Sequence, residues 1–136
     1  MITLADLSDD AKVSVGQSVR IVVVDDEPVI AWTLEMILRE KGYDTVSFTN
    51  PLTALERVLD FLPDIMVTDV MMPQLSGIEL AMRLNELCPQ CKVLLFSGGA
   101  QSADLLDASQ RGYDFRLLHK PVHPTELLSH LRALHS

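Results

Sequence analysis

The sequence predicts an α/β protein built on a doubly wound, five-stranded parallel sheet with five helices. From Val19 onward, short runs of valine, isoleucine, leucine and phenylalanine alternate with longer segments whose apolar residues recur at helical spacing. The runs hold few polar residues, which is typical of strands that helices cover on both faces. Regular alternation of this kind is assembled through right-handed crossovers between parallel strands.

Five runs predict the strands. The first is the clearest, because Arg20 is the one polar residue within it. In chain order the predicted strands are Val19–Val24, Asp44–Phe48, Asp64–Thr68, Lys92–Phe96 and Phe115–His119.

Start and stop signals place the helices between these strands. Asn50 before Pro51 is typical of an N-cap followed by a first-turn proline, and Ser76 with Glu79 matches a capping box. Gly42 and Gly112 stand where two helices should end. The predicted helices are Pro28–Lys41, Pro51–Leu62, the helix capped by Ser76 that ends near Leu87, a weaker one over Gln101–Arg111, and Pro124–Leu134.

The chain of 136 residues is long enough for one domain with a substantial core. Residues 19–136 are expected to form this domain, and Met1–Ser18 to be an N-terminal extension. The sequence stops directly after the last predicted helix, so no appended effector domain is expected within it.

The charge balance narrows the classes of partner. A formal net charge of −8 argues against a nucleic-acid surface, which needs a basic patch, and suits a metal ion or a partner with a basic rim. No segment approaches the roughly 20 apolar residues of a membrane span, and the N-terminus lacks a signal-peptide pattern. We therefore expect a cytoplasmic protein that contacts neither nucleic acid nor membrane.

Two cysteines form the sequence Cys88-Pro89-Gln90-Cys91. A redox pair of the thioredoxin kind follows a strand and sits at a helix N-terminus, which lowers a thiol pKa. This pair follows a predicted helix and precedes a strand, and no second pair completes a zinc site. An ordinary loop is the preferred interpretation.

Polar residues directly follow four of the predicted strands. Asp25 and Asp26 come after the first strand and Asp69 after the third, while Ser97 and Lys120 follow the fourth and fifth. Ligands of open α/β sheets bind beyond the carboxyl ends of the strands. In the flavodoxin-like strand order 2-1-3-4-5 the first and third strands are neighbours, so three carboxylates should converge.

This convergence predicts a cation site with phosphoryl chemistry. Clustered carboxylates repel one another unless they are protonated or bind a cation, and hard oxygen ligands with room for water favour Mg²⁺. The Asp69 carboxylate can attack a phosphoryl group and form an acyl phosphate. Lys120 can neutralise phosphoryl oxygens, and Ser97 can donate a hydrogen bond to one of them.

The chain resembles the receiver domains of two-component response regulators from about Val19 to its C-terminus. The resemblance rests on motifs at successive strand ends: Val22-Val23-Val24-Asp25-Asp26-Glu27-Pro28, Thr68-Asp69-Val70-Met71-Met72-Pro73, Ser76-Gly77, Phe96-Ser97-Gly98 and Lys120-Pro121.

The resemblance implies a role for each site residue. Asp69 would be the phosphoacceptor, Ser97 the switch hydroxyl and Lys120 the lysine that contacts the phosphate, before a cis Pro121. Mg²⁺ would be held by Asp26 directly, by Asp25 through a water, by Asp69 and by the backbone carbonyl of Met71.

The resemblance also implies partners and a mode of action. The phosphoryl donor would be a phosphohistidine on a sensor histidine kinase or phosphotransfer protein, and the output would pass to a downstream protein effector. The chain would be a signalling switch rather than an enzyme, a monomer or weak dimer, that acts alone or as a phosphorelay intermediate.

The sequence departs from the family pattern at the aromatic switch position. Many receivers carry tyrosine or phenylalanine three residues before the lysine, where this chain has Leu117. Phe115 lies two residues earlier and is a candidate for a partial substitute, so the usual coupling between hydroxyl and aromatic is in question.

Two further positions predict slow loss of the phosphoryl group. Met71 and Gly99, each two residues after a site residue, have no polar side chain to orient an attacking water. We therefore expect slow autodephosphorylation.

The first predicted helix has two apolar faces. Ile30, Leu34, Ile37 and Leu38 share the face expected to pack on the sheet. Val29, Trp32 and Met36 lie on the other side, and exposed Trp and Met side chains are typical of protein interfaces. Two interpretations stay open: docking of a helical phosphohistidine domain, and incidental exposure or cover by Met1–Ser18.

Other functions are weighed against the receiver interpretation. A Mg²⁺-dependent phosphohydrolase with an Asp nucleophile usually has a second Asp two residues on, where this chain has Met71. A phosphorylation-independent module with the same fold would be expected to lack an acidic residue or the lysine. A flavin-binding protein would need a Ser/Thr/Gly-rich phosphate loop after the first strand.

Overall fold

The apolar runs of the sequence form the centre of a parallel sheet. The computed structural model describes residues 18–98, 102–113 and 115–135. The strands are β2 (Arg20–Val24), β3 (Asp44–Phe48), β4 (Ile65–Asp69), β5 (Lys92–Ser97) and β6 (Arg116–His119). The helices are α1 (Pro28–Glu40), α2 (Pro51–Phe61), α3 (Gly77–Leu87), α4 (Ser102–Gln110) and α5 (Pro124–His135).

The five strands lie in the order β3-β2-β4-β5-β6, and all pairs are parallel. This is the predicted order 2-1-3-4-5. The register pairs Val24 with Thr68, and Asp69 with Phe96. The carboxyl ends of β2, β4 and β5 therefore meet at one edge, where the polar residues that follow them lie.

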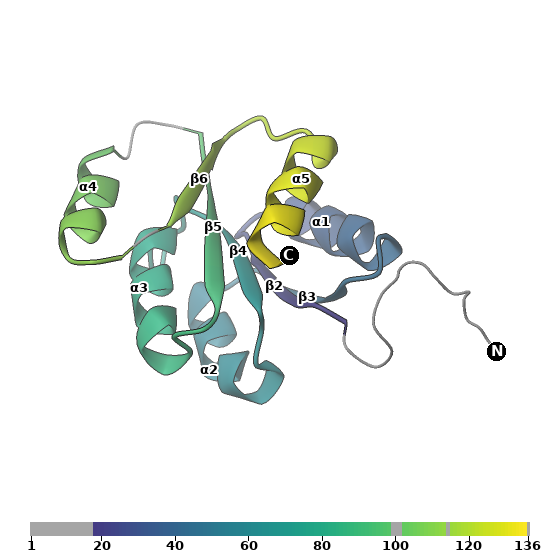
Figure 1. Cartoon of the computed structure of the whole chain (residues 1–136), viewed down its shortest axis with the longest axis horizontal. Helices are drawn as coiled ribbons and strands as arrows, with labels where there is room; N and C mark the ends of the chain where they lie inside the picture. The colour runs from purple at the N-terminus through teal and green to yellow at the C-terminus, as the bar shows by residue number, and fades with distance from the viewer. Residues whose placement is uncertain (1–17, 99–101, 114, 136) are drawn as a thin grey trace.

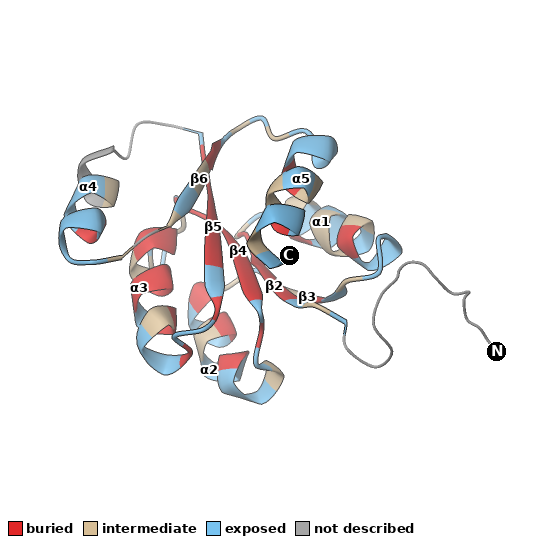
Figure 2. Ribbon diagram, viewed as in Figure 1, coloured by how far each residue is buried: buried red, intermediate tan, exposed pale blue. Residues whose placement is uncertain are grey.

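Helices cover both faces of the sheet (Figure 1). α1 and α5 lie on one side, whereas α2, α3 and α4 lie on the other. Alternate residues of one strand point to opposite faces: Val22 and Val24 pack with α2 and α3, while Ile21 and Val23 pack with α1 and α5. Figure 2 shows the buried residues concentrated in the central strands, between helices whose outer faces are exposed.

Local chemistry explains most helix ends. The Asn50 side chain accepts a hydrogen bond from the Leu52 N–H, and the Ser76 hydroxyl oxygen accepts one from the Glu79 N–H, so both predicted N-caps are confirmed. The Glu79 carboxylate lies beside Arg83, four residues on. Gly42 and Gly112 have φ values of +97° and +94°, a left-handed conformation that suits glycine.

Several boundaries differ from the prediction by one or two residues. β2 begins at Arg20 rather than Val19, β6 at Arg116 rather than Phe115, and β4 extends to Asp69. α2 ends at Phe61 because Leu62 adopts a left-handed conformation, with φ of 54°. Residue 101, where a helix was expected to begin, and residues 1–17 of the expected extension lie outside the described residues.

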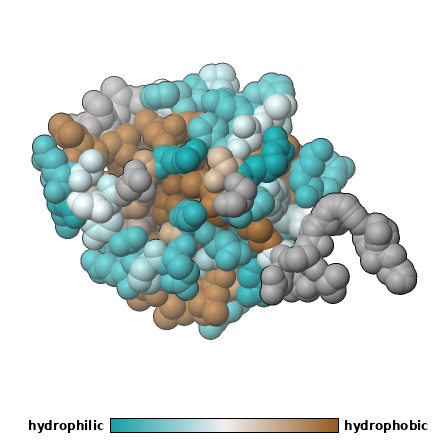
Figure 3. Space-filling view, in the orientation of Figure 1, coloured by the Kyte–Doolittle hydropathy of each residue, from teal (hydrophilic) through white to brown (hydrophobic). Residues whose placement is uncertain are grey.

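Apolar side chains also reach the surface. Figure 3 shows apolar residues at the lower edge of the molecule, where α2 lies. Leu52 and Leu59 of α2, and Leu62 directly after it, are exposed. Within the described part of the chain, no helix combines the length and apolar character needed to cross a membrane.

Candidate functional site

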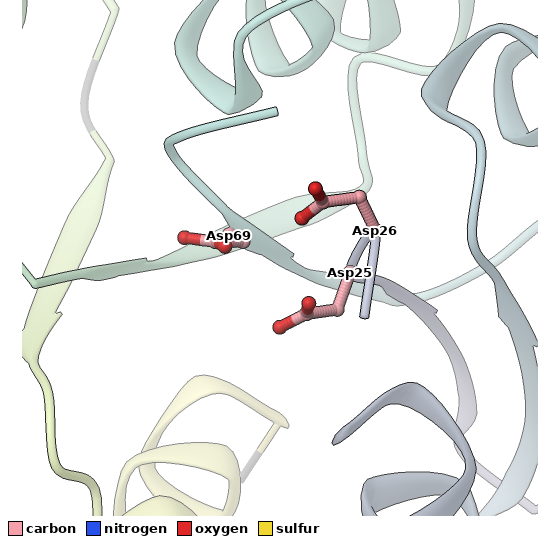
Figure 4. Close-up of side chains that lie close together, drawn as sticks. All are labelled: Asp25, Asp26 and Asp69. Carbon is pink, nitrogen blue, oxygen red and sulfur yellow. The ribbon is translucent and has the colours of Figure 1, made fainter. Parts of the chain in front are cut away.

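Three carboxylates converge at the carboxyl edge of the sheet, as predicted. Asp25 and Asp26 directly follow β2, and Asp69 is the last residue of β4. Figure 4 shows the three side chains extending toward the same space. One carboxylate oxygen from each can be chosen so that all lie within 4.8 Å of one another.

Burial distinguishes the three acids. Asp25 is 1% exposed and Asp69 7%, whereas Asp26 is only partly buried. The Asp25 Oδ1 atom accepts a hydrogen bond from the Glu27 N–H (2.9 Å), and the Asp69 Oδ1 atom accepts one from the Met71 N–H (3.3 Å). Each buried carboxylate is therefore oriented by the loop that follows its own strand.

Lys120 brings positive charge to the acids. Its Nζ atom lies 3.2 Å from Asp69 Oδ2 and 3.9 Å from Asp25 Oδ2. The Lys120 N–H donates a hydrogen bond to the Ser97 carbonyl oxygen (2.8 Å), which fixes the lysine backbone beside the end of β5. The Lys120–Pro121 peptide bond is cis, as the resemblance implied.

The buried position of Asp25 is electrostatically unfavourable for its ionised carboxylate. Burial raises the pKa of its carboxyl above the ordinary value of 3.8, and the nearby Asp69 and Asp26 carboxylates raise it further. The Glu27 N–H and Lys120 act in the opposite direction. Burial is the largest of these causes, so the pKa is raised overall.

The site has the features of a hard-cation site. Asp25 Oδ2 is a buried oxygen atom without a hydrogen-bond partner. An oxygen of this kind beside two further carboxylates can be satisfied by a cation or by a water bound to one. The residues present therefore fit Mg²⁺, with Asp25, Asp26 and Asp69 available to hold it.

The remaining predicted site residues lie near the same edge. Ser97 is the last residue of β5 and is 1% exposed, and the Met71 side chain is exposed in the loop after β4. Gly98 leaves space beside Lys120, since a Cβ there would meet only the lysine side chain, at 3.8 Å. Gly99 lies outside the described residues.

Leu117 and Phe115 pack on the side of the sheet that α2 and α3 cover. Both are partly buried, and Phe115 stacks on Tyr113 with ring centroids 5.6 Å apart. Phe115 precedes β6 rather than belonging to it, which corrects the predicted strand boundary.

The cysteine pair lies in the predicted loop. Cys88 caps the C-terminus of α3, and both thiols are free and buried. Burial raises the pKa of the Cys91 thiol to about 12, the opposite of what a nucleophilic cysteine needs. The preference for an ordinary loop over a redox pair is consistent with this environment.

Two residues for which the sequence predicts no role, Thr68 and Gly77, contact the main chain of Asp69. The buried Thr68 hydroxyl donates a hydrogen bond to the Asp69 carbonyl oxygen, and Gly77 packs against the same peptide. A glycine in the first turn of a helix, where every residue except proline has a higher helix propensity, was the available signal for Gly77.

Comparison with known proteins identifies the family. The chain matches the response regulator receiver domain over residues 21–132. It is 31% identical over 115 residues to the response regulator receiver protein CpdR of Brucella abortus, a match that covers 85% of this chain and 95% of CpdR. The chain therefore belongs to the response regulator receiver family, whose members act as phosphoacceptor switches in two-component signalling and are generally not classed as enzymes.

A longer relative and a solved structure agree with this assignment. The chain is 34% identical over 119 residues to the probable transcriptional regulatory protein TcrX of Mycobacterium tuberculosis, covering 88% of this chain but only 50% of TcrX. The fold matches a CheY-like receiver domain protein from Methanospirillum hungatei with a TM-score of 0.80 and 25% identity, over 86% of this chain and 93% of that one.

Proposed function

We propose that this chain is a phosphorylatable receiver that accepts a phosphoryl group from a phosphohistidine onto Asp69. The observation that carries the proposal is the placement of the Asp69 carboxylate, 3.2 Å from the Lys120 ammonium and within the cluster formed with Asp25 and Asp26. Neither the acids nor the lysine is lost, so the main reason to favour a phosphorylation-independent module is absent.

The transfer is a displacement at phosphorus. One oxygen of Asp69 forms a bond to the phosphorus atom as the bond from phosphorus to the histidine nitrogen breaks, and the imidazole leaves with the bonding electron pair. Mg²⁺, when bound, supplies neutralisation of the charge on the phosphoryl oxygens. Asp26, Asp25, Asp69 and the Met71 carbonyl are the groups proposed to hold it.

Lys120 and Ser97 stabilise the transferred group. The lysine already pairs with Asp69 and is free to follow the new negative charge onto a phosphoryl oxygen. Ser97, at the end of the neighbouring strand, is the hydroxyl proposed to donate to another phosphoryl oxygen, and this contact would report phosphorylation to β5 and β6.

The exposed face of α1 supports a docking site for the phosphoryl donor. Val29, Trp32 and Met36 are 72%, 59% and 69% exposed on the helix that begins two residues after Asp26. We place the helical phosphohistidine domain of a sensor kinase or phosphotransfer protein on this surface, and we place the output in contacts with a downstream protein. Slow autodephosphorylation and a cytoplasmic, monomeric or weakly dimeric state belong to the same proposal.

Intact-mass spectrometry tests the proposed function. After incubation with Mg²⁺ and acetyl phosphate, the parent chain is expected to gain one phosphoryl group, and EDTA or the Asp69→Ala substitution is expected to prevent it. Asp60→Ala, which removes an exposed carboxylate from α2, is the matched control and should gain the group normally. If neither acetyl phosphate nor a phosphorylated histidine kinase transferred a group, the phosphorylation-independent module would replace this proposal.

A further inference from the structure

The first residue of α3 packs directly against the main chain of Asp69. Gly77 is buried, and its N–H donates a hydrogen bond to the Val70 carbonyl oxygen (2.9 Å). A Cβ atom at Gly77 would lie 2.1 Å from the Asp69 carbonyl oxygen and 2.9 Å from the Asp69 carbonyl carbon. Both atoms belong to the backbone, so no side chain can turn aside to make room.

The same carbonyl oxygen is held by a second contact. The Thr68 hydroxyl, which is fully buried, donates a hydrogen bond to it over 3.0 Å. The Asp69 peptide is therefore fixed by Thr68 and limited by Gly77. Its carboxylate is in turn 3.2 Å from Lys120 Nζ and 3.3 Å from the Met71 nitrogen.

We propose that Gly77 and Thr68 are positioning residues, which hold the Asp69 peptide where its carboxylate reaches both Lys120 and the metal-binding acids. The inference rests on the proposed phosphotransfer to Asp69. A methyl group at Gly77 would have to displace the peptide by about 1.3 Å, from 2.1 Å to the 3.4 Å of an ordinary contact. A misplacement of that size at a reacting group can lower a rate by about 100-fold.

Gly77→Ala and Thr68→Val test the two contacts separately. Thr68→Ser keeps the hydroxyl and is the conservative partner of Thr68→Val. Ser76→Ala is the matched control for Gly77→Ala, because it removes the N-cap of the same helix without adding an atom beside Asp69. The measurements are the Mg²⁺ affinity from titration calorimetry, the rate of phosphorylation by acetyl phosphate at saturating Mg²⁺, and the unfolding midpoint.

Gly77→Ala is expected to lower the phosphorylation rate about tenfold or more, and Thr68→Val about threefold. Thr68→Ser and Ser76→Ala should stay within about twofold of the parent, although Ser76→Ala lowers the unfolding midpoint. If Gly77→Ala fails to fold, the phosphorylation rates of Thr68→Val and Thr68→Ser decide whether contacts with the Asp69 peptide position its carboxylate.

Two results would overturn the positioning role. One is a parent-like rate and Mg²⁺ affinity in every folded variant at Gly77 and Thr68. The other is a loss of rate in Ser76→Ala equal to that in Gly77→Ala, which would trace the effect to helix stability. If the parent itself took no phosphoryl group, the proposed function would fail, and the Mg²⁺ affinities of Gly77→Ala and Ser76→Ala would still decide the positioning of Asp69.

Discussion

The environment of the Asp25 carboxylate lowers the stability of the folded protein. Its carboxylate is nearly inaccessible to solvent, one of its oxygens lacks a hydrogen-bond partner, and two other acids lie beside it. Natural sites often retain such a cost because the group is needed for binding.

The raised pKa of Asp25 gives the metal-free protein a defined pH dependence. Burial raises the folded-state pKa of Asp25 above 3.8, so the folded state binds more protons than the unfolded state between pH 3.8 and the folded-state pKa. The contribution of Asp25 to the free energy of unfolding therefore falls as the pH rises through the folded-state pKa. Asp25→Asn should remove the penalty, and urea unfolding in EDTA at neutral pH should show a higher midpoint than the parent.

Asp60→Asn provides the comparison for this measurement. It also removes one negative charge, but from an exposed position on α2 beside Arg57. An equal rise of the urea unfolding midpoint in both variants would assign the effect to net charge rather than to the burial of Asp25.

Met71 is expected to control the lifetime of the acyl phosphate. Its side chain is 61% exposed and has no group to orient water, while its N–H contacts Asp69. The parent phosphoprotein should persist for minutes or longer, and Met71→Asn should shorten its half-life about tenfold by positioning an attacking water. Loss of the phosphoryl mass with time measures this, and a parent lifetime of seconds would contradict it.

Among the elements, helix α1 connects the acid cluster to an exposed apolar surface. Of the four residues predicted for its inner face, Leu38 belongs to the core cluster and Leu34 packs against it, whereas Ile30 and Ile37 are only half-buried. The prediction omitted Ala31, which is buried. Its outer face leaves Trp32 and Met36 exposed, as the helical spacing predicted.

The Trp32→Ala substitution tests docking of the phosphoryl donor separately from phosphoryl transfer to Asp69. Loss of a central aromatic side chain commonly costs an interface about 2 kcal/mol, so transfer from a phosphorylated histidine protein should slow about tenfold or more. Phosphorylation by acetyl phosphate should not change, since Trp32 is not part of the acid cluster.

Leu59→Ala is the matched control for Trp32→Ala. Leu59 is 53% exposed, close to the 59% of Trp32, but it lies on α2. Unchanged transfer in Trp32→Ala, or equal slowing in Leu59→Ala, would remove α1 as the docking surface.

The sequence predicted elements whose signals are local. Most helices and strands are determined by residues that are close together in the sequence. These signals are the hydrophobic runs, the first-turn prolines and the caps at Asn50 and Ser76. The predicted end of α2 was one residue too late, because Leu62 adopts a left-handed conformation and precedes Pro63, and the residue before a proline disfavours the helical region.

The site was predictable for a similar reason. A parallel sheet carries the residues after its strands to one edge, so Asp25, Asp69 and Lys120 could be brought together from strand order alone. The contacts of Thr68 and Gly77 with the Asp69 peptide could not be predicted in this way, because they depend on how closely α3 approaches β4.

At the scale of the whole molecule, metal binding and stability are linked. A ligand that binds only the folded state adds about 2.7 kcal/mol to the free energy of unfolding at 100 times its dissociation constant. Mg²⁺ should therefore raise the melting temperature by several degrees, and Asp26→Asn should abolish most of this rise.

Asp60→Asn again serves as the control and should retain the Mg²⁺-dependent rise. Differential scanning calorimetry over a range of MgCl₂ concentrations measures the effect. A rise that persisted undiminished in Asp26→Asn would show that the ion binds elsewhere.

The position of the acyl phosphate tests phosphoryl transfer onto Asp69 most directly. Borohydride reduces an aspartyl phosphate to homoserine, so peptide mapping of the reduced phosphoprotein identifies the residue that was modified. Homoserine in place of Asp69, and its absence when Mg²⁺ is withheld, is the predicted result. Homoserine at Asp25 or Asp26, or at no position in a protein that carries the phosphoryl mass, would contradict the assignment of Asp69 as the phosphoacceptor.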